Sequence, residues 1–330
     1  MGAVSEVKGP LPDAGMEAPE QSRSCPICGC REVSFFLAAP DRYYMRQERY
    51  RLLRCTSCNG VWLDNPPNPE EMLFHYGADY YRGIAIAGET AALQRWKERN
   101  RVISRYKQSG EILDIGCSSG GFLGTLKGGS WKLHGIEIAP AMADRARINT
   151  GADVFVGDAL AAPFDAARFD VITCFDVLEH VYDPQALLQK ALEWLKPGGI
   201  FYTMLPNIDS WESRLFGSYW YGLELPRHLF HFSPQSLRYL MEAVGFEEGS
   251  IATQSGSYLE NSSRYVCAKM AGSIGITPRP LAKAGRSSLP WKAVRKLLRA
   301  SLVVPFAALA SISGAGGCME AVFIKPARTI

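Results

Sequence analysis

Short apolar segments alternate with segments of helical length from Glu111 onward, and this alternation constrains the fold more than any other feature. The predicted strands lie at 111–115, 133–138, 153–157, 169–174 and 200–205, and the predicted helices between them at 120–127, 140–149 and 184–195. Strands joined by helices of about ten residues form parallel sheets with right-handed crossovers. The sequence therefore predicts an α/β fold with a Rossmann-like, doubly wound, mostly parallel sheet. A further helix at 234–244 and strands at 247–254 and 319–325 extend it.

A glycine-rich turn, Gly116–Gly120, follows the first of these strands. Backbone N–H groups of such a turn, at the carboxyl edge of a parallel sheet, form a ligand site. Asp114 precedes the turn, where a carboxylate repels a diphosphate and holds an α-amino group, so we expect a ligand with an amino-acid end. Glu137 ends the next strand, 23 residues later, where it can accept hydrogen bonds from two ribose hydroxyls. Asp158 follows the third strand and suits an adenine amino group.

In combination, these residues resemble the motifs of the class I S-adenosylmethionine-dependent methyltransferases. The matching segments are Leu113–Gly120, Gly135–Ile138, Val156–Asp158, Phe169–His180 and Leu195–Gly199. The resemblance implies that S-adenosylmethionine is the cofactor and that its site is formed by Asp114, Gly116, Ser118, Gly120, Glu137, Ile138, Asp158, Ala159, Phe175 and Asp176. It also implies that Asp114 and Gly116 hold the methionine end of the cofactor. Ser118 stands where the family usually has a second glycine.

Two Cys-x-x-Cys pairs lie near the N-terminus, with 26 residues between them. Two such pairs on tight turns provide the four thiolates of a tetrahedral zinc site, and four protein ligands leave no open position for catalysis. No apolar leader segment is visible at the N-terminus, which makes disulfides less expected than metal. We therefore predict a structural Zn²⁺ in a small zinc-ribbon module. Its ligands are Cys25, Cys28, Cys55 and Cys58.

Three of the five histidines fall where an acceptor molecule would bind. His180 follows the fourth strand of the sheet, and His228 and His231 lie in the aromatic-rich segment after the fifth strand. With the cysteine pairs, this arrangement resembles zinc-ribbon methyltransferases that act at carbon on nucleotide-linked deoxysugars. The resemblance implies that His228 is the catalytic base, although Arg227 stands where that family has glutamate. The alternative is that these histidines pack a lid segment, and the sequence alone does not decide which of the three is catalytic.

The chain divides by composition into four parts. Residues 1–24 are rich in proline and glycine and predict a disordered tail. Residues 25–69 form the predicted zinc-ribbon module, and residues 70–108 read as a helical linker or lid. The predicted methyltransferase domain covers 109–330 and includes a basic helical insertion at about 280–314.

The formal net charge is only +3, but its distribution is uneven. Residues 261–319 contain nine Lys and Arg and no Asp or Glu, so the rest of the chain sums to 3 − 9 = −6. Lys292, Arg295, Lys296 and Arg299 share one face of a predicted helix. Three interpretations are open: a helix covering the pocket or joining two copies, a peripheral membrane contact through 288–312, and nucleic-acid binding, which the acidic remainder makes least expected. The apolar segment that follows is too short to span a bilayer. We expect a cytoplasmic protein, in the second interpretation peripheral at the membrane.

The expected function is methyl transfer to a small-molecule, sugar or lipid-linked acceptor. Three alternatives are kept. Residues Asp176–His180 also resemble the ubiquinone-type O-methyltransferases, which act on membrane-dissolved phenols. Some RNA base methyltransferases have an N-terminal cysteine-rich module. Finally, the chain could be a non-catalytic zinc-ribbon adaptor, against which the intact set of Asp114, Glu137 and Asp158 argues.

Overall fold

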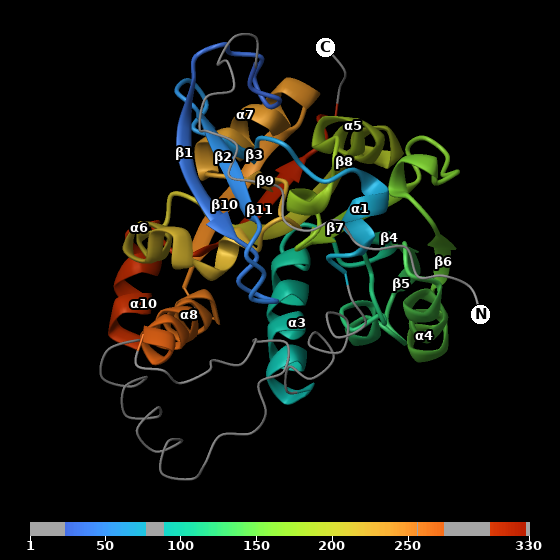
Figure 1. Ribbon diagram of the computed structural model, residues 1–330. Helices are drawn as coiled ribbons and strands as arrows, with labels where there is room; N and C mark the ends of the chain where they lie inside the picture. The colour runs from blue at the N-terminus through green and yellow to red at the C-terminus, as the bar shows by residue number, and fades with distance from the viewer. Residues whose placement is uncertain (1–23, 77–88, 256, 274–303, 328–330) are drawn as a thin grey trace, which may run out of the picture.

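The computed structural model describes residues 24–76, 89–255, 257–273 and 304–327, and it contains two sheets (Figure 1). The predicted tail at 1–24 lies outside the described residues apart from Ser24, and so does the basic helical face at 292–299. Of the segment 288–312, only 304–312 is described. Within the described part of the chain, no helix is both long and apolar enough to cross a membrane.

The larger sheet has seven strands in the order β10-β11-β8-β7-β4-β5-β6. These are β4 (Gly110–Ile115), β5 (Trp131–Glu137), β6 (Asp153–Val156), β7 (Phe169–Phe175), β8 (Leu195–Pro206), β10 (Glu247–Gln254) and β11 (Cys318–Ile324). Strands β6, β5, β4, β7 and β8 are parallel, whereas β11 is antiparallel to both β8 and β10. The predicted Rossmann-like, mostly parallel sheet is therefore confirmed. The strand order reverses between β4 and β7, which is where ligands bind in open α/β sheets.

Helices cover both faces of this sheet. They are α3 (Glu89–Ile103), α4 (Pro140–Thr150), α5 (Pro184–Trp194) and α7 (Pro234–Val244). Three of them begin with proline at the first helical position, where the missing N–H costs nothing. Gly151 and Gly245 then end α4 and α7 in the left-handed conformation. These local signals explain why the sequence pattern places α7 at its observed bounds.

One predicted helix is wrong. Residues 120–127 form only a single 3-10 turn, η1 (Leu123–Thr125), rather than an α-helix. Three glycines lie in this segment, and glycine is unfavourable in helix interiors. Gly120 moreover has φ +81°, so it does not have helical backbone.

The cysteine pairs flank a small antiparallel sheet of order β1-β2-β3-β9. Its strands are β1 (Val33–Pro40), β2 (Arg49–Cys55), β3 (Val61–Leu63) and β9 (Phe230–His231). The fourth strand comes from the distant segment that contains the predicted histidines, with Val61 paired to His231 and Trp62 to Phe230. The N-terminal module and that segment are thus parts of one sheet.

The remaining elements connect or flank the two sheets. Helix α1 (Pro69–Leu73) follows the small sheet, and α6 (Trp211–Phe216), α8 (Ser257–Ser273) and α10 (Val304–Ile312) lie together at one corner of the molecule (Figure 1). Short 3-10 turns occur at η2 (Ala159–Ala161), η3 (Leu178–His180), η4 (Gly217–Tyr219) and η5 (Tyr221–Leu223).

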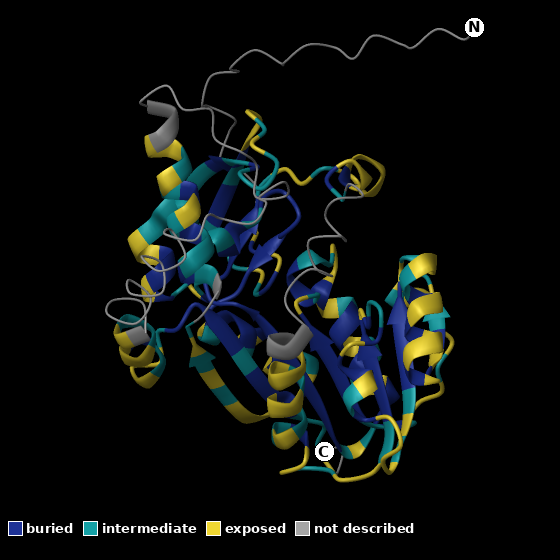
Figure 2. Cartoon of the chain, turned by 90° about the horizontal axis from the view of Figure 1, so that it is seen from below, coloured by how far each residue is buried: buried dark blue, intermediate teal, exposed yellow. Residues whose placement is uncertain are grey.

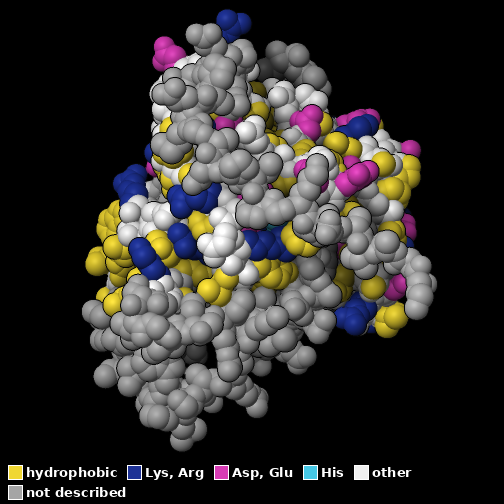
Figure 3. All heavy atoms as spheres, viewed as in Figure 1, with side chains coloured by type: hydrophobic (Ala, Val, Ile, Leu, Met, Phe, Trp, Pro, Cys, Tyr) yellow, Lys and Arg dark blue, Asp and Glu magenta, His cyan; other side chains and the backbone are white. Residues whose placement is uncertain are grey.

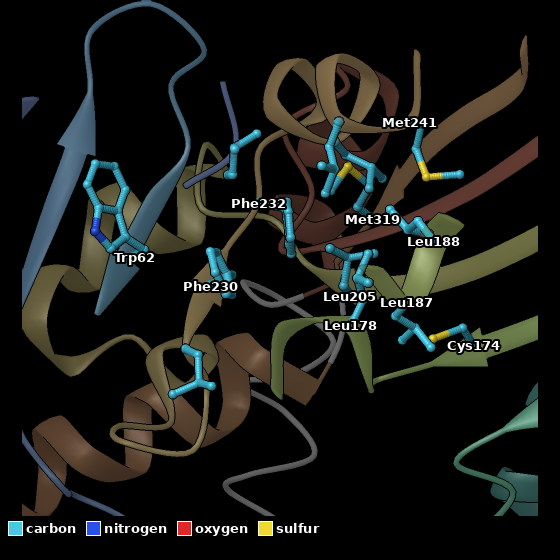
Figure 4. Packing of buried hydrophobic residues seen from close by; sticks show 14 of the residues in the cluster. Trp62, Cys174, Leu178, Leu187, Leu188, Leu205, Phe230, Phe232, Met241 and Met319 are labelled. Carbon is cyan, nitrogen blue, oxygen red and sulfur yellow. The ribbon is translucent and has the colours of Figure 1, made fainter. Parts of the chain in front are cut away.

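Successive side chains of β4 point to opposite faces of the sheet and enter two different cores. Ile112 packs in a cluster with residues of α3 and α4, whereas Leu113 belongs to a cluster with α5 and α7. The second cluster continues into the small sheet, and Figure 4 shows Trp62, Phe230 and Phe232 leading from there toward the core around Leu205. In Figure 2 the strands are mostly buried while the helices show exposed outer faces. The small sheet therefore shares a hydrophobic core with the large one.

Candidate active site

Asp114 lies near the carboxyl end of β4, beside the point where the strand order reverses. Its side chain is buried, and the Thr173 hydroxyl of β7 donates to its Oδ1 at 2.6 Å. Burial raises the pKa of the Asp114 carboxyl to about 7, although the Thr173 hydrogen bond and the charge of Arg99 act in the opposite direction. A cation placed here would stabilise the ionised form of this carboxyl.

Glu137 ties the end of β5 to the glycine-rich turn. Its Oε2 accepts a hydrogen bond from the Ser118 N–H at 2.8 Å, and its Oε1 accepts one from the Ala139 N–H at 2.9 Å. Each carboxylate oxygen can accept a second hydrogen bond, so both retain capacity for hydroxyl donors. The geometry therefore suits the predicted ribose contact.

The turn itself needs unusual backbone conformations. Gly116 has φ +74°, and a Cβ there would lie 2.4 Å from Cγ2 of Val177, which no side chain could tolerate. Ser118 also has a positive φ, of 48°, so the serine adopts the left-handed conformation that a glycine adopts at less cost.

The other predicted cofactor residues are more dispersed. Asp158 is exposed after β6, and its Oδ1 accepts from the Leu160 N–H at 2.9 Å. Ile138 is exposed, Ala159 is half-buried beside Asp158, and Asp176 is exposed with φ 54°. The structure thus brings Asp114, the turn and Glu137 to one edge of the sheet, while the roles of the remaining residues stay predictions.

Phe175 is buried and belongs to an aromatic cluster under α3. Its ring centroid lies 5.2 Å from that of Phe122 and 6.1 Å from that of Trp96. The guanidinium of Arg99 lies 4.3 Å from the centroid of the Trp96 ring and 4.4 Å from that of Phe175. Arg99 is buried, and its Nη1 has no hydrogen-bond partner among the described residues. The sequence does not distinguish Arg99 from the other charged residues of α3, so it was not predicted as a site residue.

The histidines form a second cluster. The rings of His180 and His228 meet edge to face with centroids 4.6 Å apart, and His231 lies 6.1 Å from His228. The Nδ1 of His228 lies 2.9 Å from the Gly222 carbonyl. Because a carbonyl only accepts, His228 carries its proton on Nδ1, and its Nε2 is available to accept one.

The same reasoning applies to the other two histidines. His180 Nδ1 lies 3.0 Å from the Arg227 carbonyl and 2.9 Å from the Tyr76 hydroxyl. His231 Nε2 lies 3.1 Å from the Leu223 carbonyl, so His231 connects β9 to the turn η5. Burial lowers the pKa of His180 and of His231 to about 4 and that of His228 well below its usual value. All three are therefore neutral at pH 7.

A buried and a half-buried carboxyl group lie beside these histidines, and neither was predicted. Glu179 is buried with no hydrogen-bond partner for either carboxyl oxygen among the described residues, and burial raises its pKa well above its usual value. It contributes an oxygen to a cluster in which ligand atoms of Glu179, His180 and His228 all lie within 4.8 Å of one another. Glu224 Oε2 lies 3.7 Å from His228 Nε2. Neither role is visible in the sequence, because it depends on which carboxylates become buried.

Arg227 points away from the histidines and into the N-terminal module. It is fully buried and donates to both carboxylate oxygens of Asp41, at 3.0 and 3.1 Å. It also forms an ion pair with Glu224 at 3.3 Å. Burial raises the pKa of Asp41, but the hydrogen bonds from His75 and Arg227 outweigh it and lower that pKa to about 2. This buried ion pair fixes the histidine segment to the loop between β1 and β2.

The four predicted metal ligands converge. Ligand atoms of Cys25, Cys28, Cys55 and Cys58 all lie within 4.8 Å of one another. The Cys25 and Cys58 sulfurs are 3.6 Å apart and the Cys28 and Cys55 sulfurs 3.5 Å. A tetrahedral site with metal–sulfur bonds of about 2.3 Å has edges of about 3.8 Å, so this arrangement fits a thiolate-bound metal ion.

The site agrees with what the chain resembles in known proteins. Residues 88–248 match the family model described as methyltransferase domain. The ubiquinone biosynthesis O-methyltransferase of Paraburkholderia phytofirmans is 32% identical over 125 residues, covering 35% of this chain and 53% of that protein. The protein of the same name from a Shewanella species is 31% identical, covering 33% of this chain and 49% of that protein. The chain thus spans about half the length of these curated relatives.

Among solved structures, a SAM-dependent methyltransferase from Archaeoglobus fulgidus is 18% identical with a TM-score of 0.48, covering 77% of this chain and 99% of that one. The assignment of the domain depends instead on the strand order and on the family match. The matched residues include Asp114, Glu137 and the glycine-rich turn between them, and this turn connects to β4 at the point where the strand order reverses. Residues 88–248 of this chain are therefore a class I S-adenosylmethionine-dependent methyltransferase domain.

Proposed function

We propose that this protein transfers the methyl group of S-adenosylmethionine to a small-molecule, sugar or lipid-linked acceptor. One observation carries the proposal: Asp114 and Glu137 lie at the ends of neighbouring strands and enclose the glycine-rich turn. The buried Asp114 carboxyl suits the cationic amino group of the cofactor, and Glu137 suits its ribose hydroxyls. When bound, the cofactor supplies a methyl group on a sulfonium, which is a good leaving group.

The chain then has to align the acceptor and remove a proton from it. His228 is the best candidate for the base, because its Nε2 is unprotonated and faces the Glu224 carboxylate at 3.7 Å. A proton taken up at Nε2 would be stabilised by that carboxylate. His180 lies against His228 and is held by Tyr76, which favours a role in orienting the acceptor or the base.

The position of Arg227 bears on the sugar C-methylation interpretation. The resembled family has glutamate at that position, whereas here Arg227 is directed into the module by Asp41. Glu224, three residues earlier, places a carboxylate beside His228 instead. This arrangement supports a carboxylate beside the proposed base, with the acidic group supplied from position 224.

For the cysteine cluster we propose a structural Zn²⁺ bound by Cys25, Cys28, Cys55 and Cys58. The sulfur spacing supports a closed site, because four thiolates fill the tetrahedral coordination of the ion. The chain would then consist of a zinc module at 25–69, a helical linker at 70–108 and a methyltransferase domain at 109–330. The fourth strand of the small sheet, β9, belongs to the proposed methyltransferase domain and pairs with β3 of the proposed module.

Methylation of a phenol at a membrane surface is a second candidate function. It is favoured by the two curated relatives, which carry the name ubiquinone biosynthesis O-methyltransferase. The base that such a reaction needs would again be His228. The match covers only about half of those proteins. Their name therefore does not identify the acceptor of this protein.

Calorimetry with S-adenosylmethionine and then a screen of cell-extract fractions with methyl-labelled cofactor test the proposal. We expect micromolar cofactor binding and a labelled product that mass spectrometry can identify. His228→Ala should abolish labelling while leaving cofactor affinity unchanged, whereas Ile148→Ala on the exposed face of α4 should change neither. Failure to bind the cofactor at millimolar concentration would refute the proposed activity.

A further inference from the structure

Three helices that the catalytic site does not use meet at one corner of the molecule. Helix α6 packs against α8, and the ring of Trp211 lies 6.0 Å from that of Phe306, which joins α6 to α10 (Figure 1). Helix α10 packs against β10, with Ala310 fully buried. The corner is therefore a fixed part of the fold.

The outward faces of these helices are apolar. On α10, the exposed residues recur at 305, 308, 309 and 312, the spacing of one helix face. Leu309 is 60% exposed and Ile312 85%. We define the docking patch by its exposed apolar side chains, which are Trp211, Leu215, Met270, Ala308, Leu309 and Ile312. Leaving such side chains in water costs about 25 cal/mol per Å² of apolar area, so exposed apolar side chains gathered on neighbouring helices indicate an interaction surface.

Basic side chains lie on two of the helices that carry the docking patch. Arg214 on α6 and Arg264 and Lys269 on α8 are exposed. Of the described residues at 261–273 and 304–319, Arg264 and Lys269 are the charged ones, and both are basic. Figure 3 shows hydrophobic and basic side chains together along this side of the molecule, without acidic ones among them in that view. Two copies of the chain meeting through this surface would bring like charges together, which disfavours self-association.

We propose that the docking patch attaches the protein to an anionic lipid surface. A tryptophan, large aliphatic side chains and surrounding Arg and Lys are what an interfacial site requires. The described part of helix α10 has nine residues, a length that can lie in the interface but cannot cross the bilayer. Anionic headgroups complement the basic surroundings, whereas a neutral apolar partner would leave that charge unmatched. The attachment does not depend on the proposed methyl transfer.

Sedimentation of the full chain with lipid vesicles tests the proposal. We expect binding to vesicles of phosphatidylcholine mixed with phosphatidylglycerol, weak binding to phosphatidylcholine alone, and a loss of binding as salt increases. Leu309→Glu with Ile312→Glu should weaken binding at least about tenfold, because one buried leucine already contributes that factor. Leu215→Glu on α6 should also weaken vesicle binding, and it tests the docking patch on a second helix.

Ile148→Glu is the matched control, since Ile148 is 80% exposed on the distant helix α4. It should leave vesicle binding unchanged. Affinity for S-adenosylmethionine, measured in every variant, shows that the domain is folded and reports separately on the proposed activity. Equal loss in the control, undiminished vesicle binding in both patch variants, or no preference for anionic vesicles would overturn the proposal. So would light scattering that shows a dimer which the patch variants separate.

Discussion

At the scale of single residues, the buried carboxyl of Asp114 should make cofactor binding depend on pH. Its pKa of about 7 means that a fraction of the empty protein is protonated at neutral pH, and the cationic amino group of the cofactor binds the ionised form. Affinity should therefore fall as the pH drops below about 7, by up to about tenfold per pH unit. Calorimetry in buffers of different ionisation enthalpy should detect proton release at about pH 6.

Two controls separate this effect from general acid sensitivity. Asp114→Asn should bind more weakly and lose the pH dependence. Methylthioadenosine, which lacks the amino-acid end, should bind with the same affinity across the range. An affinity for the cofactor that stays constant between about pH 6 and about pH 8 would show that Asp114 does not face the amino group.

Arg99 is expected to hold the carboxylate of the same amino-acid end. It is buried against Trp96 and Phe175, its charge acts on Asp114, and its Nη1 has no partner among the described residues. Arg99→Met should weaken cofactor binding by about 1.5–3 kcal/mol, the contribution of a hydrogen bond to a charged group. Methylthioadenosine affinity should not change. Arg101→Met, exposed on the same helix, is the control; an equal loss there would assign the effect to α3 as a whole.

At the scale of elements, the ion pair between Asp41 and Arg227 should be a main support of the histidine segment. Both side chains are completely buried, so Asp41→Asn removes the carboxylate that binds Arg227 through two hydrogen bonds and leaves its ion pair with Glu224. Breaking such a pair costs about 3–5 kcal/mol. Urea unfolding measures this loss, with Glu248→Gln at the exposed Arg238–Glu248 pair as a control that should cost under about 1 kcal/mol. A cost for Asp41→Asn no larger than the control's would contradict the assignment.

How far the sequence predicts an element depends on whether its signal is local. Strands β4, β7 and β8 follow from continuous apolar runs, and α7 follows from its proline and its terminal glycine. Strand β9 has two residues and exists only because it pairs with β3 across the fold, so no local pattern indicates it. The helix predicted at 120–127 does not form, because its three glycines oppose the helix that its apolar spacing indicates.

The same distinction applies to the site. Asp114 and Glu137 were predictable because each lies near the end of an apolar strand at a motif spacing. The contact between Asp41 and Arg227 joins residues 186 positions apart, and the burial of Glu179 without a partner depends on the packing of the whole domain. The cysteine cluster is an intermediate case, since two short local motifs specify it and only their convergence needs the fold.

At the scale of the whole molecule, the shared core predicts that the two sheets unfold together. One cluster of buried side chains includes Cys25 and Leu52 of the module as well as Phe201 and Met319 of the large sheet. A calorimetric scan of the metal-loaded protein should therefore show one transition, and S-adenosylmethionine should raise its midpoint by mass action. Two transitions, of which the cofactor shifts only one, would mean that the module folds independently.

Metal removal should act on that same transition. Cys55→Ser removes one of four thiolates, so the metal content should fall from one ion per chain to nearly none, because an incomplete tetrahedral site binds far more weakly. The single unfolding midpoint should drop as well, since the module supplies part of the common core. Cys30→Ser is the matched control: Cys30 lies beside the cluster but outside the set of four, and its variant should keep both metal and midpoint. Elemental analysis and calorimetry of the same preparations decide the matter, and metal retained by Cys55→Ser would exclude the four-cysteine site.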